Sequence, residues 1–323
     1  MIWYTIAIDA EDQLRQRMAW ALSQIFVIGR EGSKHPQATE RFVTYYDIFV
    51  RNAFGNYRDI LDEVTYHPQM GYYLTYELNT KSGDQLNTPD DSFPDENYAR
   101  EVMQLFTIGL WQLNEDGTLK RNGDGEEIPT YDNEDVSEFA KVFTGLAKPD
   151  KFVYDLPNAY PNYPNYEEYQ NQNYIDEMRL ISWRHDYNPK IDLYDQPFTN
   201  QWGGAGYEDA IRKDIGYVLD QLFNHTNTPP FVAHQLIQRF TVSNPSPTYI
   251  SDVAQAFKTG VFTSGSNTFG QSGDRGNLEA VIAAILLHPE ARTPSLQADQ
   301  TFGKFREPLK YLTYKIFGAR SRT

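Results

Sequence analysis

The sequence predicts a mainly α-helical fold, a multi-helix domain that carries one small β-hairpin and one long irregular insertion. Three observations predict it. Apolar residues recur at helical spacing over residues 10–74 and again from about residue 228. Asp-Gly and Asn-Gly pairs separate short β-compatible pieces within residues 110–131, as in a hairpin. Residues 148–206 are rich in Tyr, Asn and Pro and keep no sustained period.

The N-terminal section is predicted to be helical throughout. Apolar residues three and four apart indicate a first helix over about residues 10–28. A second helix, rich in aromatic residues, should end near Gly55. A third helix continues the pattern to the His67-Pro68 pair, where the proline should break or kink it.

The central section is predicted to hold one helix on each side of the hairpin. Tyr98, Val102 and Leu105 recur at helical spacing in the first of these. The second covers about residues 133–144 and is closed by Gly145, because glycine readily adopts the left-handed conformation that ends helices.

Residues 148–206 are interpreted as an ordered insertion at the surface. Tyrosine can cover apolar surface while its hydroxyl stays in water, so this composition favours packing against the domain. Two other interpretations stay open. The segment could be a flexible linker of low complexity, or it could form a surface for binding a polypeptide or for assembly.

Two strings of the sequence align without a gap, GNYRDILDEVTYHP at residues 55–68 and GNLEAVIAAILLHP at residues 276–289. Each ends a series of three predicted helices. An internal pseudo-repeat of two three-helix units would explain the match, and chance similarity between amphipathic helices is the alternative. In both strings a histidine, His67 or His288, precedes a proline at a helix end, where we expect it to satisfy terminal carbonyl groups.

The composition argues against several classes of function. The 323 residues include 29 Lys and Arg against 44 Asp and Glu, which gives a net charge of −15. Nucleic acid is not expected as a partner, because such binding draws most of its free energy from Lys and Arg. The chain has no cysteine, which rules out disulfides and thiolate metal sites. No apolar run approaches the ~20 residues of a transmembrane helix, and the opening MIWYTIAI does not have the pattern of a signal peptide.

Several longer strings resemble, in the same order, the successive blocks of the domain of unknown function 1800 family. They are PDENYAREVMQLFTIGLWQLNEDG (94–117), NEDVSEFAKVFTG (133–145), NTPPFVAHQLIQRFTVSNPSPTYI (227–250), RGNLEAVIAAILLHPEAR (275–292) and GKFREP (303–308). The resemblance implies a predominantly helical protein, often exported in bacteria, without an established reaction. It also implies that residues 1–323 form one helical domain, the later part of a longer protein. The chain departs from many members at Phe106 and Leu146, where they often have His and Trp.

The densest group of polar side chains lies in PDENYARE. On a helix Glu96 and Arg100 are four residues apart, as are Asn97 and Glu101. A carboxyl with a raised pKa could act as a general acid while its neighbour stays ionised, so Glu96 and Glu101 are candidate catalytic residues. Asn97 and Arg100 are candidate binding residues, since a guanidinium can hold an anion with two hydrogen bonds. The interpretation we favour is a structural network in which Arg100 is largely buried against Glu96 or another carboxylate.

His185 is the third candidate catalytic residue, because loops often bring functional side chains to a cleft. Asp186 and Lys190, in the same HDYNPK string, are candidate binding residues, with capping or packing as the alternative role. The acidic segment 114–127 fails the EF-hand template, and no glycine-rich nucleotide loop occurs. No cofactor and no metal are therefore expected.

Two functions remain. The first is an extracytoplasmic or surface scaffold that binds a polymer or a partner chain through the Tyr/Asn-rich insertion. The second is a hydrolase or lyase that acts on a glycan or another polar polymer through the Glu/Arg/His group. A cleft that brings His185 close to Glu96 or Glu101 would favour the enzyme, and a solid core there would favour the scaffold.

Overall fold

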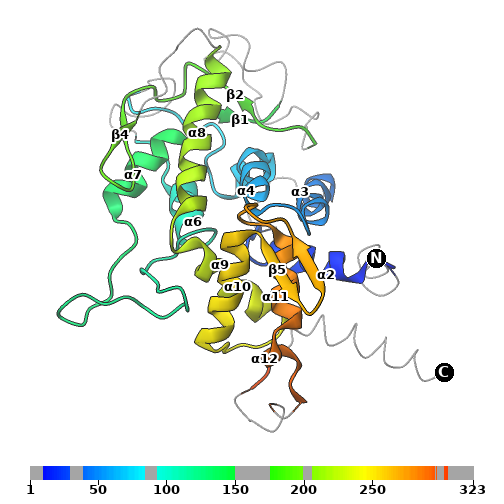
Figure 1. Cartoon of the computed structure of the whole chain (residues 1–323). Helices are drawn as coiled ribbons and strands as arrows, with labels where there is room; N and C mark the ends of the chain where they lie inside the picture. Colours follow the sequence, from blue (N-terminus) through cyan, green and yellow to red (C-terminus); the bar gives the residue numbers. More distant parts are fainter. Residues whose placement is uncertain are drawn as a thin grey trace.

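Helices form the body of the molecule and account for 49% of the residues that the structure describes, which confirms the predicted fold class. The structure is a computed structural model. It describes residues 10–29, 39–83, 93–149, 175–198, 206–294, 296 and 302–304. The arrangement of the helices is shown in Figure 1.

The N-terminal unit consists of four consecutive helices: α2 (Gln13–Ser23), α3 (Thr39–Arg51), α4 (Tyr57–Tyr66) and α5 (Pro68–Tyr73). Helix α3 packs against both α2 and α4. Aromatic rings fill the space between them, with the rings of Phe26 and Phe49 stacked at 5.8 Å and that of Tyr57 at 5.6 Å from Phe26. Of these rings, Phe49 lies on the second helix, α3, where Tyr45 is buried beside it.

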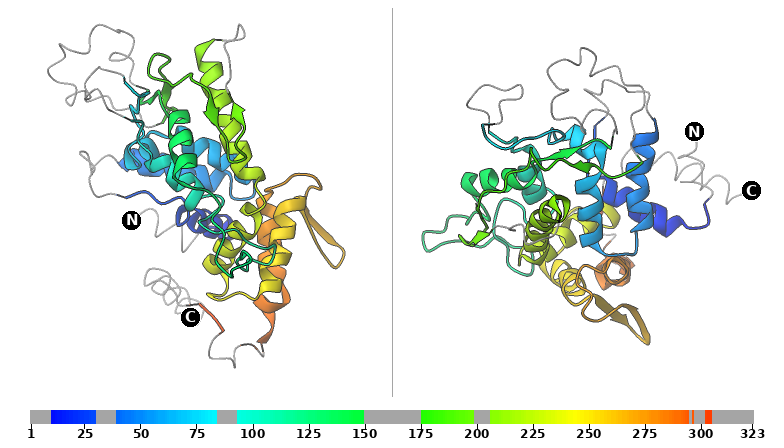
Figure 2. Two further views of the ribbon diagram at one scale, coloured as in Figure 1. Left: turned by 90° about the vertical axis from the view of Figure 1, so that its left-hand side faces the viewer. Right: turned by 90° about the horizontal axis from the view of Figure 1, so that it is seen from above.

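The C-terminal unit repeats the same order of helices: α9 (Thr228–Phe240), α10 (Pro247–Thr259), α11 (Leu278–Leu287) and α12 (Pro289–Arg292). A hairpin of β5 (Val261–Ser264) and β6 (Asn267–Gly270) separates α10 from α11 and projects from the body of the molecule (Figure 2). The helices α2 and α9, which begin the two units, pack against each other. The order of elements thus agrees with the pseudo-repeat suggested by the two aligned strings.

The two units meet through the aligned strings themselves. The N–H of Tyr57 donates to the carbonyl of Gly276 at 2.9 Å, and the N–H of Leu278 donates to the carbonyl of Gly55 at 2.8 Å. These reciprocal bonds form an antiparallel bridge between the residues that cap α4 and α11, Asn56 and Asn277. We call this contact the asparagine bridge. Each asparagine side chain also accepts a backbone N–H of its own helix, so one short motif starts both helices.

The side chains of the two histidines at the ends of the strings do not satisfy terminal carbonyl groups as expected, although the backbone N–H of His67 donates to the carbonyl of Val64 at 3.2 Å. Nδ1 of His67 instead accepts the backbone N–H of Gln69, and Nδ1 of His288 accepts that of Glu290. Each histidine therefore caps the start of the next helix, α5 or α12, whose first residue is the proline. Burial lowers the pKa of His67 to about 4, with a smaller contribution from Arg51, so its ring is a neutral acceptor at neutral pH.

The central section links the two units. Its helices are α6 (Asn97–Gln104), α7 (Asn133–Val142) and α8 (Tyr207–Asn224), and its two antiparallel pairs are β1 (Leu146–Ala147) with β2 (Arg179–Leu180) and β3 (Lys190–Ile191) with β4 (Pro197–Phe198). The long helix α8 packs between α4 on one side and α7 on the other (Figure 1). Gly145 has φ +82° and ends α7 close to the position predicted for it.

The hairpin predicted within residues 110–131 contains no regular strand. The segment forms isolated bridges instead. Three backbone hydrogen bonds connect its parts: the N–H of Gln112 donates to the carbonyl of Ile128, the N–H of Ile128 to the carbonyl of Lys120, and the N–H of Lys120 to the carbonyl of Gln112. Two tight turns, one at Gly117 with φ +78° and one at Gly125 with φ +83°, divide the segment into pieces too short to form regular strands. The Asp-Gly pairs therefore mark turns correctly, but there are two turns where one was expected.

Part of the predicted insertion, residues 148–206, can be assessed. Its residues 150–174, which hold most of the Tyr, Asn and Pro, and its residues 199–205 lie outside the described part of the chain. Residues 175–198 pack against the helical body, with Met178 and Ile181 buried. Among the described helices, none is long and apolar enough to span a bilayer.

Gly276 offers a test of the asparagine bridge. It has φ +82°, and an added Cβ would lie 2.6 Å from the ring of Phe223. Gly273 has a similar φ of +87°, but an added Cβ would meet nothing within 4 Å. Gly273→Ala should therefore lose about 1 kcal/mol of unfolding free energy, the cost of a left-handed L-residue, whereas Gly276→Ala should lose about 3 kcal/mol because the overlap adds to it. Urea denaturation of both variants measures the two losses, and equal losses would contradict the close packing at the bridge.

Candidate functional site

The first group of candidate residues lies on helix α6, and its ion pair is exposed. Arg100 Nη2 lies 3.1 Å from Glu96 Oε2, as the four-residue spacing predicted. The two side chains are 39% and 42% exposed, however, so the expectation that Arg100 is largely buried is wrong. Asn97 begins the helix at the surface, where its backbone N–H donates to the carboxylate of Asp95. An exposed pair of this kind contributes little to stability.

Glu101 has a more unusual environment than the rest of α6. Its Oε2 is buried and accepts no hydrogen bond, and the hydroxyl of Tyr131 is likewise buried without a partner. Burial raises the pKa of the Glu101 carboxyl, against a lowering by Arg100. Burial also raises the pKa of Tyr131, and the charge of Glu101 adds to the rise, so the two side chains are close enough to interact.

The second group of candidate residues gathers around helix α8. His185 Nε2 lies 3.2 Å from Asp214 Oδ2, and Lys190 Nζ lies 2.8 Å from the same oxygen. The carbonyl of Asp186 accepts a further hydrogen bond from Lys190 at 2.5 Å. All four of these residues are buried. They form a closed polar network within the core, which we call the His185 network.

The His185 network resembles a Thr-His-Asp triad but lacks its accessibility. Thr144 Oγ1 lies 3.4 Å from His185 Nδ1, on the side of the ring opposite Asp214. Its hydroxyl donates to the carbonyl of Lys141 at 2.6 Å, and its oxygen accepts the N–H of Asp186 at 2.9 Å. A nucleophile needs a free route to substrate, whereas Thr144 and His185 are both 0% exposed. This arrangement therefore anchors the chain rather than offering a reactive hydroxyl.

The structure does not join the two groups. Among the described residues, no hydrogen bond or ion pair connects His185 with Glu96 or Glu101. The partner that the sequence analysis missed is Asp214 on α8. The sequence does contain a pattern that indicates a buried Asp214, because this acidic residue interrupts the apolar face of α8 on which Ile211 and Ile215 are buried. An ionisable side chain in such a stripe predicts a buried partner.

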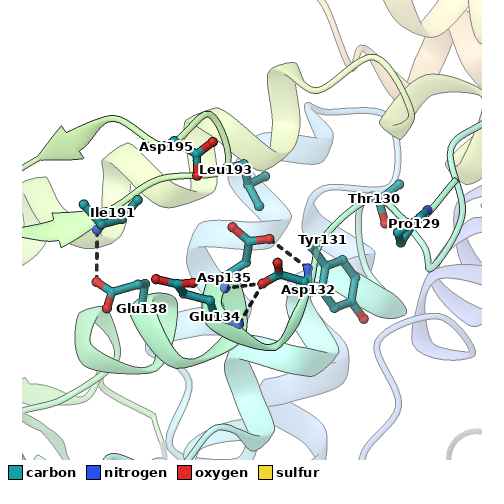
Figure 3. A pocket seen from close by; sticks show the side chains of 10 residues that line it. All are labelled: Pro129, Thr130, Tyr131, Asp132, Glu134, Asp135, Glu138, Ile191, Leu193 and Asp195. Carbon is teal, nitrogen blue, oxygen red and sulfur yellow. Dashed lines mark hydrogen bonds between the residues drawn. The ribbon is translucent and has the colours of Figure 1, made fainter.

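An open cleft lies between the start of α7 and the turn that joins β3 to β4. It has a volume of about 260 Å³. Figure 3 shows the side chains of the two elements on either side of it. Its lining combines five carboxylates with apolar and aromatic groups: Asp132, Glu134, Asp135, Glu138 and Asp195, together with Pro129, Thr130, Tyr131, Ile191 and Leu193. We call this the acidic cleft.

Two of the carboxylates are needed to begin helix α7. Asp132 accepts the backbone N–H groups of Glu134 and Asp135, while the Asp135 carboxylate accepts the N–H of Asp132 at 2.8 Å. This reciprocal capping box places both acids at the positive end of the helix dipole. Glu138, one turn later, accepts the N–H of Ile191 at 3.0 Å and pairs with Lys141. It thereby ties α7 to β3 across the cleft.

The charges in the cleft repel one another. Burial raises the pKa of the Asp135 carboxyl, and the hydrogen bond from the Asp132 N–H opposes that rise. The negative charges of Asp132, Asp195 and Glu134 raise the pKa by smaller amounts. Asp195 stands on the opposite side in a left-handed conformation, with φ +58°, which orients the turn. A positively charged group in the cleft would relieve this repulsion. Among the described residues, no group of three or more His, Asp or Glu side chains has the arrangement of a metal site.

Arg100→Ala tests the description of the exposed ion pair. We expect the substitution to lower the free energy of unfolding by less than about 0.5 kcal/mol, as for other i, i+4 pairs in water. Arg275→Ala is the matched control, because that guanidinium donates to the carbonyls of Phe223 and His225 and lies over the Phe257 ring. It should lose at least about 2 kcal/mol. Thermal or urea denaturation compares the two, and a large loss for Arg100→Ala would contradict the exposed placement.

Comparison with known proteins identifies the family but no reaction. Neither a curated protein nor a solved structure matches the chain. The family model described as "Protein of unknown function (DUF1800)" matches residues 1–316, which is nearly the whole chain and includes both helical units, the His185 network and the acidic cleft. The chain therefore belongs to the DUF1800 family.

Proposed function

We propose that this protein is a helical scaffold that binds a partner chain, and that the acidic cleft receives a basic segment of that partner. The observation that carries the proposal is the unbalanced charge of the cleft. Five carboxylates line it, and Lys141 is the cation paired with one of them, Glu138. Apolar walls at Ile191 and Leu193 suit the methylene stem of a lysine or arginine side chain, whose charged end would face the acids.

Asp135 has a structural role in the capping box of α7, and its electrostatics support a binding role beside that one. Like charges held together destabilise a fold, and a site kept at such a cost is a candidate for function. The chain as a whole carries a net charge of −15, which would speed the approach of a basic partner. The proposal includes an extracytoplasmic or cell-surface location, supported by the resemblance to an often exported family. Cell fractionation with detection of the full chain tests that part.

The alternative, a hydrolase or lyase, has less support. It needs His185 near Glu96 or Glu101, whereas the ring of His185 is wholly buried and bonded to Thr144 and Asp214. The unpartnered carboxyl of Glu101 is the feature that still favours it. Turnover of a polar polymer by the wild type, lost in Glu101→Gln, would favour the enzyme over the scaffold.

The binding test uses octalysine as the probe and two variants of equal net charge. Asp135→Asn/Asp195→Asn removes one carboxylate from each side of the cleft. Asparagine keeps the capping acceptor at the first position and tolerates φ +58° at the second. The control variant is Asp59→Asn/Asp124→Asn. Asp59 is the third residue of helix α4, as Asp135 is of α7, and Asp124 lies in an exposed turn, as Asp195 lies in the turn between β3 and β4.

We expect the cleft variant to bind octalysine at least about tenfold more weakly than the wild type at low salt, a loss of about 1.4 kcal/mol. The control variant should bind within about twofold of the wild type, and added salt should weaken binding of both. Calorimetric titration measures these affinities. Equal affinities for the two variants, or no binding by the wild type, would refute the proposal.

Removing the charge of Asp135 should weaken binding of a basic partner but should raise the free energy of unfolding. The pKa of Asp135 is raised in the folded chain, so the folded form is favoured by protonation, and this contribution is lost as the pH rises above the unfolded value of about 3.9. At pH 7 we therefore expect Asp135→Asn to be more stable than Asp59→Asn by about 0.5 kcal/mol, the size of a like-charge repulsion. The difference should disappear below pH 4. Urea denaturation at both pH values measures it, and a less stable Asp135→Asn at pH 7 would contradict the repulsion.

A further inference from the structure

Six side chains of the segment 110–131 form one face of it. The isolated bridges pair Trp111 with Pro129, Leu113 with Leu119, and Arg121 with Glu127. In each pair the flanking residues make the backbone hydrogen bonds, and the side chains of such a pair lie close together on the same side. Residues two apart along an extended piece also point the same way, which joins the three pairs into one surface. We call this surface the Trp111 face.

The Trp111 face is apolar and turned to solvent. Trp111 is 41% exposed and Leu119 is 39% exposed, and Pro129 beside Trp111 is exposed as well. The two charged side chains of the face, Arg121 and Glu127, lie 2.8 Å apart and neutralise each other. Folding alone would turn the apolar side of such a segment inward. Apolar side chains gathered on an exposed face therefore mark an interaction surface.

The Trp111 face continues into the acidic cleft. Pro129 belongs to both, since it pairs with Trp111 and lines the cleft. Figure 3 shows Pro129 and Thr130 at one end of the row of lining side chains and Ile191 at the other. Asp132, a carboxylate of the cleft, follows Pro129 by three residues, which span at most about 10 Å. An extended partner could therefore reach the carboxylates and the Trp111 face with side chains about three residues apart.

The charge around the Trp111 face favours a basic occupant. Residues 110–131 contain five acidic side chains against two basic ones. One of the acids, Glu115, pairs with Lys258 of α10, and the cleft next to the face adds five more carboxylates. A second copy of this chain would also carry a net charge of −15, so like charges would oppose its approach. A basic polypeptide segment with apolar side chains fits both parts of the surface.

We propose that the Trp111 face binds an apolar side chain of the same basic segment whose cation enters the acidic cleft, about three residues away from that cation. This inference rests on the proposed function of the cleft and narrows the class of partner to an amphipathic basic segment. Burial of apolar surface against Trp111 and Leu119 supplies affinity that salt does not screen. The carboxylates speed association and orient the segment.

Two decapeptides of equal charge test the inference by calorimetric titration. Each carries four lysines at either end, and the two central residues are leucines in one peptide and serines in the other. We expect the wild type to bind the leucine peptide at least about tenfold more tightly than the serine peptide, because only leucine can bury apolar surface on the Trp111 face. Added salt should weaken binding of both peptides, but the ratio of their affinities should persist.

Trp111→Gln/Leu119→Gln removes the apolar side chains without changing the net charge. This variant should bind the serine peptide within about twofold of the wild type, which also shows that it is folded, and should lose the preference for the leucine peptide. The control, Leu14→Gln/Val43→Gln, replaces two apolar side chains of similar exposure, 43% and 50%, on α2 and α3. It should keep the preference.

Equal affinities of the wild type for the two peptides, or a preference that survives in Trp111→Gln/Leu119→Gln, would overturn the inference. If that variant does not fold, hydrogen exchange of the wild type replaces it. The leucine peptide should then slow exchange at residues 111–121 more than the serine peptide does, and equal slowing would overturn the inference. Dimers of the wild type in sedimentation that are absent in the variant would assign the face to a second copy of the chain, which would overturn it too.

The cleft itself is tested separately in the same titrations. Asp135→Asn/Asp195→Asn should weaken binding of both peptides and leave the ratio of their affinities unchanged. Unchanged binding of both peptides by this variant would refute the cleft as a binding site, whereas the comparison of the leucine and serine peptides decides on the Trp111 face.

Discussion

The asparagine bridge is the contact on which the arrangement of the helices depends. Its two backbone hydrogen bonds run in opposite directions between the starts of α4 and α11, so each helix begins on the other. The carboxylate of Asp274 accepts hydrogen bonds from the side-chain amides of both Asn56 and Asn277, which fixes their capping geometry. The bridge joins strings that are more than 200 residues apart in the chain, and the central section lies between them in the sequence. The bridge, and not the central section, therefore sets the position of the two units relative to each other.

The central section carries both the buried His185 network and the acidic cleft. Helix α8 packs on both α4 and α7, and it brings Asp214 into a core where His185 and Lys190 are fully buried. A buried charge is stable only if partners surround it, and these residues supply partners for one another. Through Lys190 the same network fixes the start of β3, and β3 provides one wall of the acidic cleft. The position of the cleft is therefore a consequence of buried charge pairing.

Local rules explain which parts of this could be predicted from the sequence. Helix periodicity and the Gly145 helix end depend on neighbours a few residues away, and they are found as predicted or close to it. The helix ends at the two His-Pro pairs were predicted in the same way, but the side chains of His67 and His288 cap the following helix instead of satisfying carbonyl groups. The pairing of His185 with Asp214 depends on how α8 packs, which no spacing reveals. The acidic cleft was missed for the same reason, because Asp195 and Asp135 become neighbours only when the turn after β3 folds over α7.

The acidic cleft and the exposed acids of the segment 110–131 are two surfaces on which a basic partner could bind, and we propose the cleft. Hydrogen exchange of the wild-type chain with and without octalysine separates the two most directly. We predict slower exchange at the first amides of α7 and at residues 191–195, since a bound cation would hold the two walls together. Slowing confined to the turns around Gly117 and Gly125, with no change at the cleft, would contradict the account.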